Sequence, residues 1–110
     1  MIVQEALNRL NILPSDSCVE VSDFVGAKNY PCCVRRENGK VIVDIVTPTM
    51  AALEQPNLIP LSAVELRQKL ETANSPEKEI VFSNYSGQVF DATCVRLEND
   101  SACFDIDGVA

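Results

Sequence analysis

The sequence contains no histidine, which is the commonest general base and metal-binding side chain in proteins. A serine or cysteine nucleophile activated by histidine therefore cannot be built from this chain. A structural zinc site is not expected either, because both cysteine–histidine ligand sets and cysteine pairs at turn spacing are missing. We expect a protein that is not an enzyme and that holds no metal and no cofactor.

Glycine clusters and long apolar runs are also missing. The four glycines never come together as a phosphate-binding loop requires; they are Gly26, Gly39, Gly87 and Gly108. No apolar run approaches membrane-spanning length, and residues 1–5 lack the basic stretch and apolar core of a signal peptide. We therefore expect a cytoplasmic protein that does not bind a membrane.

The cysteines are odd in number and lack the spacing of a disulfide framework: Cys18, Cys32, Cys33, Cys94 and Cys103. We predict reduced thiols. The adjacent Cys32 and Cys33 are expected to point to opposite faces of a strand, which disfavours a bond between them unless the chain turns there. A thiolate of Cys33 or Cys94 beside Arg35 or Arg96 is the one reactive arrangement that the sequence offers.

The formal net charge is −7, from nine basic and sixteen acidic residues. This excess disfavours nucleic-acid binding, which depends on a basic surface. One small basic cluster is present, formed by Lys28, Arg35, Arg36 and Lys40. We interpret it as ordinary surface charge, with a partner-binding patch as the alternative.

Part of the sequence occurs twice. Residues 19–45 lie over residues 80–106 without a gap, at a constant offset of 61 residues. The identical pairs are Ser22/Ser83, Gly26/Gly87, Cys33/Cys94, Val34/Val95, Arg35/Arg96, Glu37/Glu98, Asn38/Asn99, Asp44/Asp105 and Ile45/Ile106. The preceding helical stretches align at an offset of 60, which pairs Arg9 with Lys69. We predict a tandem duplication.

Each repeat has the pattern of a helix followed by three strands. Ile2, Val3, Ala6, Leu7 and Leu10 form one apolar stripe of a helix that ends before Pro14. In the second repeat, Ser62 and Glu65 form a capping box for a helix that ends near Asn74. Strands are expected over residues 18–25, 32–37, 40–46, 79–85, 92–98 and 102–107. Asn38 and Gly39 form a strong hairpin signal, and Asn99 to Ser101 are expected to turn as well.

We therefore predict an α+β fold, in which a duplicated helix–strand–strand–strand unit forms one compact pseudo-twofold domain with a mainly antiparallel sheet. Two separate domains of about 50 residues would be marginal, so the repeats should share one core. The single domain spans residues 1–110, with repeat 1 at about 1–46, a connector at 47–60 and repeat 2 at about 61–110. One helical turn is expected at residues 50–53 of the connector.

Strand alternation from the Asn38 and Gly39 turn defines two faces. The apolar face carries Val34, Val41, Val43 and Ile45, with Val95, Leu97, Ala102, Phe104 and Ile106 in the second repeat, and should pack under the helices; Arg36 is its exception. The identities between repeats cluster on the second face. We predict binding residues there: Ser22, Phe24, Cys33, Arg35, Asp44, Ser83, Tyr85, Cys94, Arg96 and Asp105. Arg35 lies diagonal to Asp44, and Arg96 to Asp105; the alternative interpretation is that these pairs serve only to stabilise the sheet.

Three functions are compatible with this pattern. The leading hypothesis is a noncatalytic interaction module, which forms a homo-oligomer or binds a protein partner through its sheet face or an exposed edge. The alternative is a sensor for a small molecule, with a cleft between the repeats lined by Phe24, Tyr85, Arg35 and Arg96. The third is an acidic inhibitor that mimics nucleic acid through the carboxylates of the second repeat.

Overall fold

The computed structural model describes residues 1–14, 16–23, 26–56, 58–98 and 101–107, and every structural statement below refers to these residues. The elements in chain order are α1 (Val3–Leu10), β1 (Val19–Ser22), β2 (Lys28–Glu37), β3 (Lys40–Val46), α2 (Pro48–Ala51), α3 (Ala63–Thr72), β4 (Ile80–Ser83), β5 (Val89–Glu98) and β6 (Ser101–Asp107). The predicted α+β class is confirmed. No described helix is both long enough and apolar enough to span a membrane.

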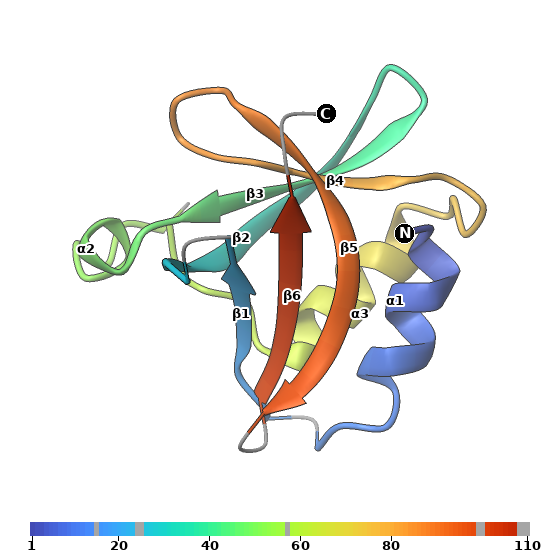
Figure 1. Ribbon diagram of the computed structural model, residues 1–110, viewed down its shortest axis with the longest axis horizontal. Coiled ribbons are helices and arrows are strands. Elements are labelled where there is room, and N and C mark those ends of the chain that lie inside the picture. Colours follow the sequence, from blue (N-terminus) through green and yellow to red (C-terminus); the bar gives the residue numbers. More distant parts are fainter. Residues whose placement is uncertain (15, 24–25, 57, 99–100, 108–110) are drawn as a thin grey trace.

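The strands form a closed barrel in the order β1-β2-β3-β4-β5-β6 (Figure 1). Sequential strands pair antiparallel, except for β3 and β4, which pair in parallel. The barrel closes through a second parallel pair, in which Val19 of β1 lies opposite Ala102 of β6. The sheet is therefore mixed, and its parallel pairs join parts of the chain that are far apart in sequence.

The strand register of the first half recurs in the second half. Val41 of β3 lies opposite Ile80 of β4, and the residues 61 positions away, Ala102 and Val19, lie opposite each other in β6 and β1. The hairpin β2–β3 has an irregularity between Pro31 and Cys33, and the hairpin β5–β6 has one between Ala92 and Cys94. The extra residues of these bulges are therefore Cys32 and Thr93.

Helices α1 and α3 pack against each other on one side of the barrel (Figure 1). Their buried residues share one core cluster with the inward-facing strand residues, so the predicted apolar face does pack under the helices. This cluster includes Leu7, Leu10, Leu66, Leu70, Val41, Val43, Phe82, Phe104 and Ile106. Leu97 is the exception, because it lies near the turn of the β5–β6 hairpin and is 54% exposed.

Local signals in the sequence define some element boundaries, whereas β1 and β4 end earlier than predicted, at Ser22 and Ser83, and β2 and β5 begin earlier, at Lys28 and Val89. Ser62 and Glu65 form the predicted capping box, with both hydrogen bonds present. Asn38 and Gly39 have positive φ angles of 52° and 74°, as a two-residue hairpin turn requires. The helical turn of the connector is displaced from residues 50–53 to Pro48–Ala51, because the Thr47 side chain accepts a hydrogen bond from the Met50 amide and caps it there. The expected turn at Asn99 and Asp100 lies outside the described residues.

Candidate functional site

Two arginine–aspartate pairs lie at equivalent positions on the outer face of the barrel. Arg35 donates from Nε to Asp44 Oδ2 at 3.0 Å and from Nη2 to Oδ1 at 3.3 Å. Arg96 donates to Asp105 in the same way, at 2.7 and 3.0 Å. Each arginine also pairs with a glutamate of its own strand, Glu37 or Glu98. The predicted diagonal ion pairs are therefore present, and both guanidinium groups are already occupied by carboxylates.

Within each pair, the hydrogen bond between arginine and aspartate favours the charged form of the groups that it joins. The hydrogen bond from Arg96 holds the pKa of Asp105 below its usual value, and the hydrogen bond to Asp105 raises the pKa of Arg96. Arg35 has a raised pKa for the same reason, the hydrogen bond to Asp44. These groups stay ionised near neutral pH and partner one another, which leaves little free positive charge for an anionic ligand.

The two pairs face away from each other. Strands β2 and β5 are three places apart in the closed order of six, so Arg35 and Arg96 lie on opposite sides of the barrel. A single cleft lined by both arginines, as the small-molecule hypothesis requires, is therefore not formed. Tyr85 is 82% exposed after β4, on the side of Arg35. Phe24 lies outside the described residues.

Each arginine–aspartate pair lies beside a predicted serine that comes from the other half of the chain. Ser83 of β4 lies beside Asp44 of β3, and Ser22 of β1 lies beside Asp105 of β6, because these strands pair in parallel. Both serines are buried, at 6% and 8% exposure. The structure thus brings the predicted residues together as two separate clusters, each built from both halves of the chain.

The thiols of Cys32, Cys94 and Cys103 have raised pKa values, which favours their protonated form. Cys32 has a pKa raised to about 12, by burial first and then by the neighbouring Cys33, with which it also shares a hydrogen bond. The expectation that Cys32 and Cys33 point apart is wrong, because the bulge interrupts strand alternation there. The pKa of Cys94 is also raised, because its thiol donates to Asp105 Oδ2 at 3.0 Å. The raised pKa disfavours a reactive thiolate at Cys94 near neutral pH.

One pocket lies over the cluster that contains Arg35, Asp44 and Ser83. It has a volume of about 380 Å³ and lies where the connector and the turn after β4 approach the outer face of β2 and β3. Five of the predicted residues line it: Cys33, Arg35, Asp44, Ser83 and Tyr85. Met50 and Leu58 of the connector add apolar surface. The pocket can hold a small, partly apolar molecule.

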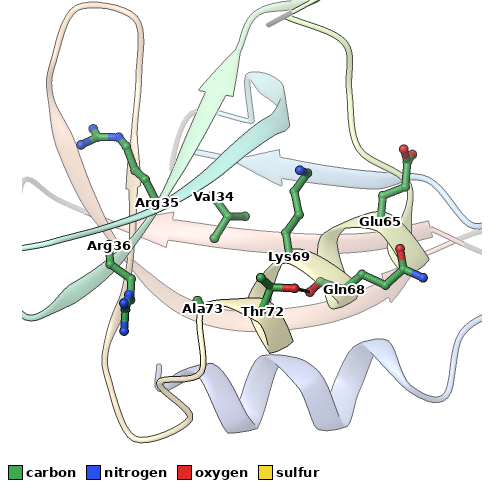
Figure 2. Close-up of a pocket in the computed structure, with 8 residues that line it drawn as sticks. All are labelled: Val34, Arg35, Arg36, Glu65, Gln68, Lys69, Thr72 and Ala73. Carbon is green, nitrogen blue, oxygen red and sulfur yellow. Dashed lines mark hydrogen bonds between the residues drawn. The ribbon is translucent and has the colours of Figure 1, made fainter.

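A larger groove separates β2 from α3, with a volume of about 550 Å³ (Figure 2). Val34, Arg35 and Arg36 line it from the strand, and Glu65, Gln68, Lys69, Thr72 and Ala73 from the side of the helix. Figure 2 shows Arg35 and Arg36 pointing to opposite sides of β2, with Val34 beside Lys69. The groove was not predicted from the sequence. The sequence feature that could have indicated the groove is Arg36, because a charged residue there interrupts the apolar face of the strand.

On the side away from β3, Val34 and Arg36 of β2 lie beside this groove with no strand partner in the described part of the chain. The neighbouring strand β1 is only four residues long and pairs with β2 at Lys28 and Asn29 alone. The Pro31 carbonyl accepts a hydrogen bond from the Leu61 amide, and from Cys32 to Glu37 the described pairing is with β3 only. Glu37 and Lys40 flank the two-residue turn and form a hydrogen-bonded pair, so by alternation the amides and carbonyls of Val34 and Arg36 face away from β3.

Within the described residues, no group of histidine, cysteine and carboxylate side chains is arranged to hold a metal ion. Comparison of the chain with protein-family models, with curated proteins and with solved structures found no match. Any functional assignment must therefore come from the geometry of the molecule itself.

Proposed function

We propose that this chain is a noncatalytic protein-binding module, which takes up an extended segment of a partner along the edge of β2. The observation that carries the proposal is the edge of β2 at Val34 and Arg36, which faces away from β3, has no strand partner among the described residues and lies beside the groove against α3. An exposed strand edge offers main-chain donors and acceptors that another chain can pair with. Strand addition at such an edge needs no catalytic group.

The dimensions of the edge suit a short strand. Six residues of β strand extend for about 20 Å at a rise of about 3.3 Å per residue. Val34 and Arg36 together present two amides and two carbonyls, which is enough for four hydrogen bonds to an added strand. The side chain of Val34 is half-buried against the core and gives the groove an apolar floor. Main-chain pairing would supply affinity, and the groove would supply selectivity.

Pairing of two copies through this same edge is disfavoured. In an antiparallel pairing of β2 with β2, the Arg36 side chains of both copies would approach one another, and so would the Lys69 side chains across the groove. Like charges directly opposite each other destabilise a strand pair. The proposal therefore favours a different protein over a second copy of this chain.

We further propose that the fold arose by tandem duplication and is pseudo-twofold, which the recurring register and bulges support. On this proposal, the edge of β5 is the counterpart of the binding edge, and Leu97 stands where Arg36 stands in the first half. The two edges share a backbone arrangement but differ in side chains. The edge of β5 is therefore a built-in control for experiments on β2.

Selection of peptides from a random display library against the purified protein tests the proposal. Peptides that bind through main-chain pairing to β2 should lose affinity for an Arg36→Pro variant, since proline removes an amide that faces the groove. The matched control is Leu97→Pro at the equivalent position of β5. Both variants place proline on an exposed strand end, so their stabilities, measured by urea unfolding, should be similar.

The expected result is a loss of binding in Arg36→Pro and retention in Leu97→Pro. Equal loss in both variants, or a loss confined to Leu97→Pro, would contradict a site at β2. A library that yields no binding peptide would contradict the function itself.

A second candidate function is the binding of a small molecule in the pocket of about 380 Å³ over Arg35 and Asp44. The observation that favours it is the number of predicted residues that meet there, together with Met50 and Leu58. Native mass spectrometry of the reduced protein would detect a retained ligand. The added mass should disappear in Tyr85→Ala and persist in Tyr30→Ala, because Tyr30 does not line this pocket. A spectrum of bare protein would argue against this function.

A further inference from the structure

We infer that the segment bound along β2 is acidic, an inference that rests on the proposed function and names the chemistry of its partner. Four of the nine basic residues of this acidic chain surround the outer end of β2: Arg36, Lys40, Lys69 and Lys78. None of the four forms an ion pair with a carboxylate within the described part of the chain. Positive charge is therefore concentrated at this one edge, where Glu65, one helical turn from Lys69, offsets part of it.

The carboxylates that border the same surface are already engaged. Glu65 accepts a hydrogen bond from the Ser62 amide at 3.0 Å, and this bond lowers the pKa of the Glu65 carboxyl group. Glu37 is paired with Arg35, which also holds Asp44. Arg35 is therefore outnumbered by its two carboxylate partners, and the positive charge of this surface comes from Arg36, Lys40, Lys69 and Lys78. Glu65 is the one carboxylate among the residues that line the groove, against the three cations Arg35, Arg36 and Lys69, so the groove attracts carboxylates of a partner.

The positive surface continues past the groove. Arg36, Lys40 and Lys78 line a hollow of about 300 Å³ around the β2–β3 turn, where the Arg36 guanidinium donates a long hydrogen bond of 3.5 Å to Ser75 Oγ. Arg36 belongs to both the groove and the hollow. An extended segment that follows β2 toward its turn would therefore pass Lys69, Arg36 and then Lys40.

The spacing of an added strand matches this arrangement. Alternate side chains of a strand point to the same side and lie about 7 Å apart. A segment with acidic residues at alternate positions would place successive carboxylates on the side of Arg36 and Lys69, while its main chain pairs with Val34 and Arg36. Nucleic acid is a less suitable polyanion, since it offers no amides to the strand edge and the whole chain carries −7.

The edge of β5 lacks the positive charge of Arg36 and again serves as a control for experiments on β2. Leu97 stands on β5 where Arg36 stands on β2, and its side chain is exposed and apolar. Arg9 of α1 corresponds to Lys69 of α3 and is likewise exposed. Charge reversal at Arg9 changes the net charge of the protein by the same amount as reversal at Lys69, but at a distance from the groove of β2.

The decisive experiment measures binding of two labelled octapeptides by fluorescence anisotropy, one alternating glutamate with threonine and one alternating lysine with threonine. We expect the glutamate peptide to bind and to weaken as salt rises, because the cations are exposed. Lys69→Glu and Arg36→Glu should each reduce its affinity by about fivefold or more, as expected for loss of an exposed ion pair followed by repulsion. Arg9→Glu should leave the affinity within about twofold, since only long-range screened charge changes.

The outcomes separate this inference from the function on which it rests. Display-selected peptides that bind the β2 edge but carry no acidic excess, and whose binding is unaffected by Lys69→Glu, would overturn the inference and leave the protein-binding function intact. Stronger binding of a labelled thymidine decamer than of the glutamate peptide would overturn it in favour of nucleic acid. Absence of any selected peptide would contradict both.

Discussion

Cys32 and Thr93 occupy the extra positions of two equivalent bulges, and each donates a side-chain hydrogen bond to the backbone carbonyl of an aspartate on the neighbouring strand. The Cys32 thiol reaches the Asp44 carbonyl at 3.4 Å, and the Thr93 hydroxyl reaches the Asp105 carbonyl at 3.1 Å. Two different side chains thus make the same contact 61 residues apart. The bulges are conserved between the halves in geometry, though not in residue type.

This correspondence predicts that threonine can replace cysteine at position 32. We expect the free energy of unfolding of Cys32→Thr to equal or exceed that of the wild type, because a hydroxyl is a stronger donor than a thiol. Cys32→Val has a similar shape without a donor, and should lose about 1 kcal/mol. Urea unfolding of the three proteins under reducing conditions measures both differences. A threonine variant that is less stable than the valine variant would contradict the role of this hydrogen bond.

The raised pKa of Cys32 predicts a loss of stability at alkaline pH. The thiol titrates near its usual value of 9.0 in the unfolded chain and at about 12 in the folded protein. Between these values the unfolded state binds fewer protons, so the free energy of unfolding falls as pH rises from about 9 to 12. Unfolding of the wild type and Cys32→Thr at about pH 8 and pH 10 isolates this contribution. An identical pH dependence in the two proteins would contradict it.

The pair of Arg96 and Asp105 predicts a measurable coupling energy. A double-mutant cycle with Arg96→Ala and Asp105→Asn should give a small favourable coupling energy, typical of an exposed pair with good geometry. Because the folded state lowers the pKa of Asp105 below 3.8, this contribution is complete above that pH and is lost as pH falls through the lower folded value. Thermal unfolding of the four proteins at neutral and acidic pH tests the sign. A coupling that grows in acid would be inconsistent with it.

The turn between β2 and β3 depends on glycine at its second position. Gly39 has a φ of 74°, and an added Cβ would meet no atom within 4 Å, so the cost of Gly39→Ala is conformational alone. We expect a loss of about 1 kcal/mol in the free energy of unfolding. Asn38→Gly should change it by less than about 0.5 kcal/mol, since Asn38 already adopts a positive φ of 52°. Comparable losses in both variants would indicate that Asn38 makes a side-chain contribution of its own.

Ser17 is the buried residue whose polar atom has no described partner. Its side chain is 6% exposed, and its Oγ forms no hydrogen bond within the described residues, while its backbone carbonyl accepts from Ala63. Ser17→Ala should therefore maintain the stability or raise it by up to about 1 kcal/mol. The comparison is Ser62→Ala, which removes the cap of α3 and should cost about 1 kcal/mol. Equal destabilisation in the two variants would show that Ser17 has a partner.

Contacts between neighbours in sequence were predictable from the residues. Asn38 and Gly39 define a two-residue turn, and the turn alone sets the register that brings Arg35 diagonal to Asp44. The capping box of Ser62 and Glu65 follows equally from local chemistry. In each case the interacting groups lie within ten residues of one another, so strand alternation and helix geometry are enough to place them.

The assembly of the two halves was decided only by the tertiary structure. Parallel pairing of β1 with β6 and of β3 with β4 joins residues separated by long stretches of chain, and no turn specifies such a register. The bulge at Cys32 is equally invisible to strict alternation. The open edge of β2 exists because β1 is short and pairs with only two of its residues. The sequence by itself thus determined the elements, their hairpins and their apolar face, through local backbone preferences. Barrel closure, the opposite placement of Arg35 and Arg96, and the groove beside β2 came from long-range packing.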